Sequence, residues 1–173
     1  MAKSFKFKNN NYVDSTGIVH NKTLLSTLLD KLLNVVPTKY LLAEISTNGY
    51  IAHEGFSDLV LTQLENNTDD KLVVENNTII IKQDIKHVRV SGVIFCEGLE
   101  NTAYIWGILY KSGYSFLSMI NSGSYFQSVV FPAKIISVQK NDVISGKIQA
   151  SGSSNVSTRT GTDTTWLLVE IIE

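Results

Sequence analysis

The feature that most constrains this chain is a change in the period of its hydrophobic pattern at Pro37. Before Pro37, apolar residues recur at spacings of three and four, which is the pattern of one face of an α-helix. After it, short runs alternate apolar and polar residues and are separated by turn-forming clusters, which predicts strands. The sequence therefore predicts an N-terminal arm with an amphipathic helix in residues 1–37 and one all-β domain in residues 38–173.

The predicted strands share β-branched or alternating apolar residues and are bounded by Asn, Asp, Gly and Ser. They span residues 39–47, 56–64, 71–75, 78–83, 86–96, 103–111, 114–120, 125–139 in one or two pieces, 142–150 and 165–172. Short strands at this spacing, with no helical pattern between them, favour a β-sandwich or jelly roll. Residues 151–165 form the longest predicted loop.

The predicted helix begins at Asn21, which is suited to an N-cap, and ends at Pro37. So short a helix with so broad an apolar stripe needs a packing partner in water. The partner is either the chain's own β domain or copies of the helix, and the second is slightly favoured. The packing candidates on the stripe are Leu24, Leu25, Leu28, Leu29 and Leu32. Alternation of Lys and Phe over residues 3–8 indicates either a strand or a flexible arm.

Several predicted strands are apolar on both faces. In residues 103–111 and 165–172 the side chains on both faces of the strand are bulky and apolar. In residues 86–96 the second face becomes apolar only toward Phe95. A two-layer sandwich covers only one face of each sheet. We therefore expect copies of the chain to cover a second face, with Phe95 and Trp166 among the contacting residues.

Composition excludes several classes of protein. A net charge of −1 and a pI of about 6.3 provide no concentration of Lys and Arg for nucleic acid. The single cysteine, Cys96, excludes an intrachain disulfide and follows an apolar run, which favours a buried structural thiol. No apolar stretch is long enough to cross a membrane, and the N-terminus does not resemble a signal peptide, so we expect synthesis in the cytoplasm.

Catalytic signatures are absent from the sequence. It contains no nucleophile elbow, phosphate-binding loop, zinc-protease motif or dinucleotide fingerprint. The histidines, His20, His53 and His87, fall in an arm, a loop and a strand, so a shared triad or metal site is not expected. The sequence thus predicts a protein that is not an enzyme and has no cofactor and no metal.

Aromatic side chains are the sharpest candidates for ligand binding, because sugar rings can lie on aromatic faces while polar groups hold their hydroxyls. The aromatic candidates lie on one face of the 103–111 strand and in adjoining turns: Tyr104, Trp106, Tyr110, Tyr114 and Tyr125. The hydrogen-bonding candidates are Asn101, Arg159 and Asp163. The alternative is that these aromatic residues fill the core or a subunit interface.

Five segments of the β region carry a resemblance to a known family. They are Ile79–Ile81, His87–Phe95, Leu109–Gly113, Ile135–Ile144 and Thr165–Ile171. In this order they resemble the jelly roll of tumour necrosis factor, of complement-type globular heads and of many phage tail-tip heads. In that family a Lys-Gly-Asp turn joins the penultimate pair of strands, whereas here Asn141 replaces the glycine. Asn tolerates a positive φ, so the departure is mild.

A second resemblance concerns the arm. Residues Tyr12–Leu25 are similar to leader segments of phage and prophage tail or baseplate proteins. Together the two resemblances imply a homotrimeric, virion-associated receptor-binding protein. Its arm would dock on tail or baseplate proteins, and its head would bind a host cell-wall saccharide. The alternatives are a structural baseplate component without receptor binding, a secreted bacterial trimeric adhesin, and a secreted enzyme that acts on surface polymer.

Overall fold

The computed structural model describes residues 38–47, 51, 55–98, 104–122, 126–151, 156–159 and 165–172, together with the backbone of 6–8, 11–13 and 19–21. The chain divides into two units, Met1–Pro37 and Thr38–Glu173. The predicted helix lies outside the described residues, apart from Asn21. Its packing candidates Leu24, Leu25, Leu28, Leu29 and Leu32 lie outside them too.

The N-terminal unit contains a small antiparallel sheet. Its strands are β1 (Lys6–Lys8), β2 (Asn11–Val13) and β3 (Val19–Asn21), and β2 is the central strand. Of the two possibilities that the Lys and Phe alternation left open, the structure therefore has the strand.

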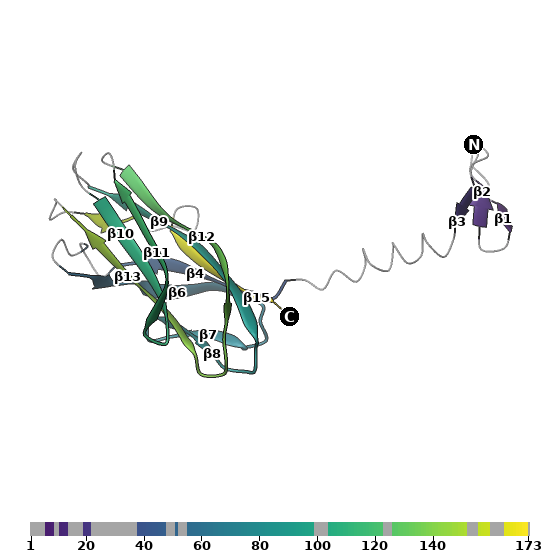
Figure 1. Ribbon diagram of the computed structural model, residues 1–173, viewed down its shortest axis with the longest axis horizontal. Coiled ribbons are helices and arrows are strands. Elements are labelled where there is room, and N and C mark those ends of the chain that lie inside the picture. Colours follow the sequence, from purple (N-terminus) through teal and green to yellow (C-terminus); the bar gives the residue numbers. More distant parts are fainter. Residues whose placement is uncertain are drawn as a thin grey trace. The chain divides into compact units, whose positions relative to one another are not determined.

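The second unit, which we call the head, consists of two antiparallel sheets whose strands run along its length (Figure 1). Sheet I has the order β12 (Phe126–Ser137), β9 (His87–Glu97), β15 (Trp166–Ile172), β4 (Tyr40–Ser46), β6 (Val60–Asn66), with β14 (Ser157–Thr158) also paired to β9. Sheet II has the order β11 (Tyr114–Ser122), β10 (Tyr104–Lys111), β13 (Val143–Ala150), β8 (Thr78–Ile81), β7 (Leu72–Glu75), with β5 (Ser57–Asp58) also paired to β13.

The core lies between the two sheets and is built from alternate residues of their strands. Sheet I contributes Val88, Val90, Ile94, Leu167 and Val169, and sheet II contributes Ile105, Leu109, Ile144 and Ile148, all at 0–1% exposure. Each fully buried aliphatic side chain stabilises the fold by roughly 1.5–3 kcal/mol relative to an exposed one. Within each strand these buried residues are separated by an even number of positions, as alternation requires, so the all-β, two-layer prediction is confirmed.

The structure corrects the predicted strands in two places. The predicted strand 56–64 is two strands, because the chain passes from sheet II to sheet I at Leu59, whose buried side chain separates β5 from β6. The predicted loop 151–165 contains β14, whose Thr158 hydroxyl accepts a hydrogen bond from the backbone N–H of Thr47 (3.1 Å). Periodicity detects neither feature, since it does not specify the sheet to which a strand belongs.

The predicted strand 125–139 is one long strand, β12, with an irregularity between Phe131 and Lys134. Pro132 lies inside this irregularity, on a strand at the edge of sheet I. Proline has no N–H to donate and is tolerated at such positions.

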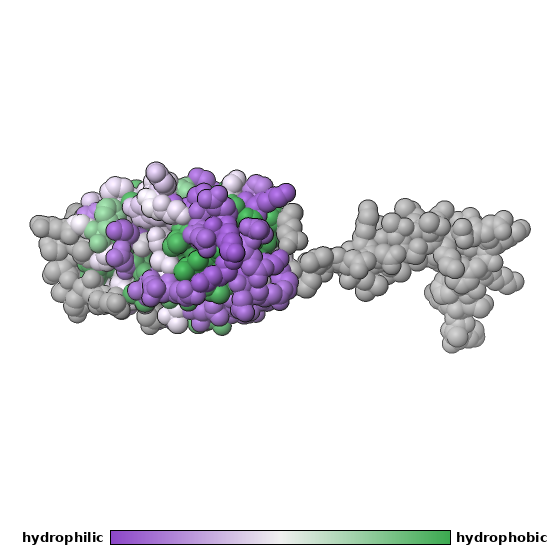
Figure 2. Space-filling view, turned by 90° about the horizontal axis from the view of Figure 1, so that it is seen from below, coloured by the Kyte–Doolittle hydropathy of each residue, from purple (hydrophilic) through white to green (hydrophobic). Residues whose placement is uncertain are grey.

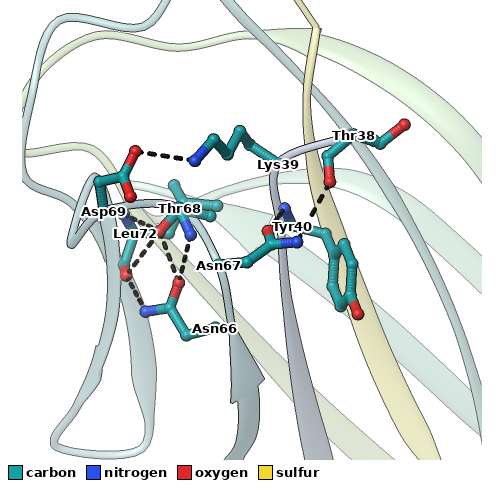
Figure 3. Close-up of polar contacts among 8 residues, drawn as sticks. All are labelled: Thr38, Lys39, Tyr40, Asn66, Asn67, Thr68, Asp69 and Leu72. Atoms are coloured by element: carbon teal, nitrogen blue, oxygen red, sulfur yellow. Dashed lines mark hydrogen bonds and ion pairs between the residues drawn. The ribbon is translucent and has the colours of Figure 1, made fainter. Parts of the chain in front are cut away.

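The turn from β6 to β7 carries the chain from sheet I to sheet II and is fixed by the side chain of Asn66 (Figure 3). The Asn66 carbonyl oxygen accepts hydrogen bonds from the backbone N–H (2.9 Å) and hydroxyl (2.6 Å) of Thr68. The Asn66 amide nitrogen donates to the carbonyl oxygen of Leu72 (2.8 Å). The buried polar groups of this turn are thereby paired, as a buried hydroxyl requires.

The same turn holds the first residues of the head (Figure 3). The backbone N–H of Tyr40 donates to the Asn67 side chain (2.6 Å), and the Lys39 ammonium lies 2.8 Å from the Asp69 carboxylate. The Lys39 charge and hydrogen bond lower the pKa of Asp69. The β6–β7 turn therefore fixes the point at which the chain enters sheet I.

We predict that Asn141 behaves as a substitute for glycine in the β12–β13 turn. Its φ is +71°, and its N–H donates to the carbonyl of Ile81 (2.7 Å). A residue with a Cβ and no local hydrogen-bonding side chain is strained here by about 1–2 kcal/mol. Urea denaturation should show that Asn141→Ala lowers the free energy of unfolding by about 1 kcal/mol relative to Asn141→Gly. Equal stabilities of these two variants would contradict the assignment.

The Asp142 carboxylate should contribute stability that is lost in acid. It accepts hydrogen bonds from the Ser112 hydroxyl (2.8 Å) and the Gln139 N–H (3.0 Å) and lies 3.5 Å from the Lys111 ammonium. Burial alone would raise the pKa of Asp142, but these partners outweigh it and lower the pKa.

Because the folded pKa is below the unfolded one, this stabilisation is present above about pH 4 and is lost as the pH falls through the folded value. Asp142→Asn should therefore lower the free energy of unfolding at pH 7 by roughly 1–2 kcal/mol. Between pH 5 and pH 3 the variant should lose less stability than the parent, because it has no carboxylate at this position to protonate. Urea titrations across this range test it. If the difference in free energy of unfolding between variant and parent were the same at every pH, the Asp142 carboxylate would not be the source of the acid sensitivity.

Candidate functional site

The head presents two outer faces, one on each sheet, made of the side chains that point away from the core. On sheet I, every second residue of β4, β9 and β15 is only partly buried, and the intervening residues are buried. Trp166 lies opposite Val93, and Leu168 lies opposite Leu42. Val130, also opposite Val93, is 53% exposed. The outer face of sheet I therefore carries a group of apolar residues beside Glu44 and Ser91, and it has no second layer within the described part of the head.

Hydrophobic side chains also reach the surface of the head between hydrophilic ones on the side that Figure 2 shows. The exposed large apolar residues include Leu64, Tyr114, Ile120, Val130 and Ile135. Single exposed apolar residues are ordinary, and these five are divided between sheet I (Leu64, Val130 and Ile135) and sheet II (Tyr114 and Ile120).

The outer face of sheet I contains a shallow hollow of about 480 Å³. Its lining is Thr38, Tyr40, Leu42, Glu65, Trp166, Leu168 and Glu170. The Tyr40 hydroxyl is hydrogen-bonded to Glu65, and this bond raises the pKa of Tyr40. Leucine and tryptophan side chains thus form an apolar floor, while carboxylates with their own partners lie at its margin.

A cross-strand ion pair adjoins this hollow. The Arg89 guanidinium donates from Nε to one oxygen of Glu170 and from Nη2 to the other, both at 2.6 Å. The hydrogen bond and the charge of Glu170 raise the pKa of Arg89. Such two-pronged pairing fixes both groups in one geometry, so the face carries this charge pair in a satisfied form.

The outer face of sheet II has a different character. Trp106 in β10 contacts the ring of Phe56 edge to face, with ring centroids 5.1 Å apart and planes at 68°. Its indole N–H donates to the Ser118 hydroxyl (2.7 Å), and Ile120, directly opposite on β11, is 63% exposed. We call Phe56, Trp106, Ser118 and Ile120 the Trp106 cluster.

The structure divides the predicted site residues between these faces. Tyr104, Trp106 and Tyr110 lie on the outer face of sheet II, while the two packing candidates Phe95 and Trp166 lie on the outer face of sheet I. The aromatic ligand candidates of β10 and the two packing candidates of the head therefore belong to different sheets.

Three ligand candidates lie outside the described residues: Asn101, Tyr125 and Asp163. Tyr114 is 81% exposed at the end of the β10–β11 hairpin, away from the Trp106 cluster. Arg159 follows β14 on the sheet I side, where its N–H donates to the Phe95 carbonyl (2.9 Å). These two residues are not brought together with Trp106.

Sequence reasoning missed the partners of Trp106. Phe56 reaches it because β5 pairs with β13, with Ser57 opposite Ile148, and β13 pairs with β10. Pairing between segments so far apart in the chain leaves no periodic signal. The aromatic character of Phe56 at the beginning of a predicted strand was the available hint.

The described residues offer little for catalysis. Cys96 is fully buried, and burial raises the pKa of its thiol to about 12, so the nucleophilic thiolate is scarce at neutral pH. Among the residues that the structure describes, no group of three or more His, Cys, Asp and Glu is placed to hold a metal ion. Nor does any helix within the described part meet the length and hydrophobicity needed to span a membrane.

Comparison with known proteins identifies the fold. No family model and no curated protein matches the chain. Among solved structures, murine APRIL at pH 5.0 is similar, with a TM-score of 0.60, 12% identity, and coverage of 78% of this chain and 99% of that one. The Eiger TNF of S. frugiperda is also similar, with a TM-score of 0.58, 11% identity, and coverage of 79% and 94%. The head is thus a TNF-like jelly roll, which confirms the fold predicted from the resemblance.

Proposed function

We propose that this chain is a non-enzymatic attachment protein that assembles as a homotrimer on the tail or baseplate of a phage or related particle and binds a host cell-surface saccharide. The observation that carries the proposal is the apolar outer face of sheet I, which the described part of the head leaves without a second layer. In a single copy this apolar surface stays in contact with water. Association with other copies would remove it from water and add hydrophobic stabilisation.

The charges on this face suit contact with another copy. Burial of an unpaired charge is costly, whereas Arg89 and Glu170 already satisfy each other within one chain. The Glu170 side chain is 13% exposed, so much of its desolvation has already taken place on folding. A second copy can therefore cover the neighbouring apolar residues without leaving either charge unpartnered.

The number of copies and the particle come from other support. The resemblance of the β segments to trimeric jelly-roll heads favours three copies. The resemblance of Tyr12–Leu25 to tail and baseplate leaders favours docking of the arm on such proteins. Several heads on one particle would convert weak single-site binding into avidity. The virion is accordingly the proposed location.

Self-association is testable through Val130, which is exposed in one copy and lies on the outer face of sheet I. Light scattering should give the parent chain about three times the 19.2 kDa of a single copy. Val130→Asp should lower this mass at micromolar concentration, because the interface would bury an unpaired carboxylate. Tyr114→Asp, a change at a more exposed site on the β10–β11 hairpin, should leave the mass unchanged. A monomeric parent would refute the trimer.

Attachment is tested by sedimentation of the trimer with purified cell walls of candidate hosts. Saturable binding that soluble wall polysaccharide competes away is expected, without release of sugar fragments. Absence of binding to every wall would favour a structural baseplate component, and fragment release would favour an enzyme. Binding by a protein that is displayed on bacterial cells rather than carried on particles would favour a secreted adhesin.

A further inference from the structure

We propose that the saccharide site lies along β10 on the outer face of sheet II, with the Trp106 cluster as its platform, and that it takes an extended, uncharged glycan. This inference rests on the attachment role proposed above and locates its ligand. It concerns the face of the sandwich opposite to the one proposed to contact other copies, so the proposed contact through sheet I does not use it.

The indole of Trp106 is held in place before any ligand arrives. Phe56, the residue before β5, contacts the indole, and the Ser118 hydroxyl of β11 accepts a hydrogen bond from the indole N–H, so two segments outside β10 hold the ring. An aromatic ring fixed in this way binds with a smaller loss of side-chain entropy than a free one. The ring is also a good partner for the C–H face of a pyranose, which is apolar while its edge carries hydroxyls.

The surroundings of the ring supply hydrogen-bonding groups. Gln149 of β13 lies directly opposite Trp106, and Ser118 of β11 lies opposite Ile108. At the far end of the strand, Tyr110 lies between Ser115 and Ser145. Hydroxyl and amide groups can both donate to and accept from sugar hydroxyls. An aromatic surface with such neighbours matches a saccharide better than it matches an aliphatic protein surface.

The charges on this face favour a neutral ligand. Lys147, opposite Ile108 on β13, lies 3.4 Å from the carboxylate of Asp58, which lies opposite it on β5. The ammonium is thus already paired within the sheet. A phosphate-bearing polymer would have to compete with Asp58 for this cation, whereas an uncharged glycan would not.

The shape of the face favours a chain of several sugars. Tyr104, Trp106, Ile108 and Tyr110 all point outward from the same strand, with neighbours in this series about 7 Å apart and the two tyrosines about 20 Å apart. Ile108 points outward and is still only 7% exposed, so its neighbours close the surface above it. The result is a continuous strip along β10, suited to an extended oligosaccharide.

The chain offers a direct reporter, because it has two tryptophans and the structure has one on each outer face. In Trp166→Phe, Trp106 is the only tryptophan, so excitation at the red edge of the tryptophan absorption band reports on it alone. This variant, verified as a trimer by light scattering, is titrated with neutral hexasaccharides of glucose, galactose, rhamnose and N-acetylglucosamine, and with poly(glycerol phosphate) as a charged comparison. At least one neutral hexasaccharide should saturably shift the Trp106 emission and protect it from iodide quenching.

The matched variants decide whether Trp106 is the platform. In the parent background Trp106→Leu, which keeps an apolar side chain at this position, should weaken binding of that hexasaccharide roughly tenfold. Tyr114→Ala removes an exposed aromatic ring outside the cluster and should bind like the parent. If Trp106→Leu melts at a lower temperature than the parent, Phe56→Leu provides a second test that leaves the tryptophan in place.

Three results would overturn the inference. They are unchanged binding in both cluster variants, preference for poly(glycerol phosphate), and no response of Trp106 to any neutral hexasaccharide. If walls still bind the trimer in any of these cases, the attachment role stands and only its location on β10 falls. If the trimer binds no wall either, the attachment role falls as well.

Discussion

A two-layer sandwich can shelter only one face of each strand, and in this head the strands at the centre of the sheets are apolar on both. β9 and β15 lie in the middle of sheet I, and β10 lies inside sheet II between β11 and β13. Their inward residues, such as Val90, Val169 and Leu109, are fully buried. Several of their outward residues, such as Phe95, Trp106 and Trp166, are also large but only partly covered. Folding of one copy therefore leaves an incomplete burial of apolar surface, and both proposed contacts of the protein arise from it.

The ion pair between Arg89 and Glu170 has two consequences for this arrangement. It joins β9 to β15 directly across the ladder, so it favours the observed register over a slip by one residue that would turn the core side chains outward. It also keeps the apolar face free of unpaired charge. Loss of either partner would leave an unpaired charge on the surface that the proposed association would dehydrate, which is costly.

The positions of strands and turns in the head were largely predictable, because the turns contain residues that tolerate a positive φ. Asp69, Asp70, Asn76, Asn77 and Asn141 all have positive φ and all lie in turns that the sequence indicated. Between such turns the alternation separated the two faces of β9, β10 and β15 correctly. The order of strands in the sheets was not available in the same way, since it depends on pairings such as β15 with β4 that join distant parts of the chain.

The candidate sites show the same division. The sequence identified Trp106, Trp166 and Phe95 as aromatic residues on second faces, and the structure assigns these faces to different sheets. It could not indicate Phe56 as a partner of Trp106, because β5 reaches β10 only through β13. Nor could it indicate the hollow on sheet I, which is assembled from β4, β6 and β15. Contacts of this kind follow from topology, and topology is the part of the fold that local propensity leaves undetermined.

The two tryptophans illustrate how surroundings rather than residue type separate the two proposed roles. Trp166 lies in a hollow with Leu42 and Leu168, where the apolar side chains of another copy would find matching aliphatic contacts. The indole N–H of Trp106 donates to Ser118, and the indole ring contacts the ring of Phe56. Gln149 lies opposite Trp106 on the neighbouring strand. A surface that holds a ring rigid among hydroxyl and amide groups is poorly suited to aliphatic packing and well suited to a ligand that is apolar on its face and polar at its edge. The same residue type therefore supports association on sheet I and recognition on sheet II.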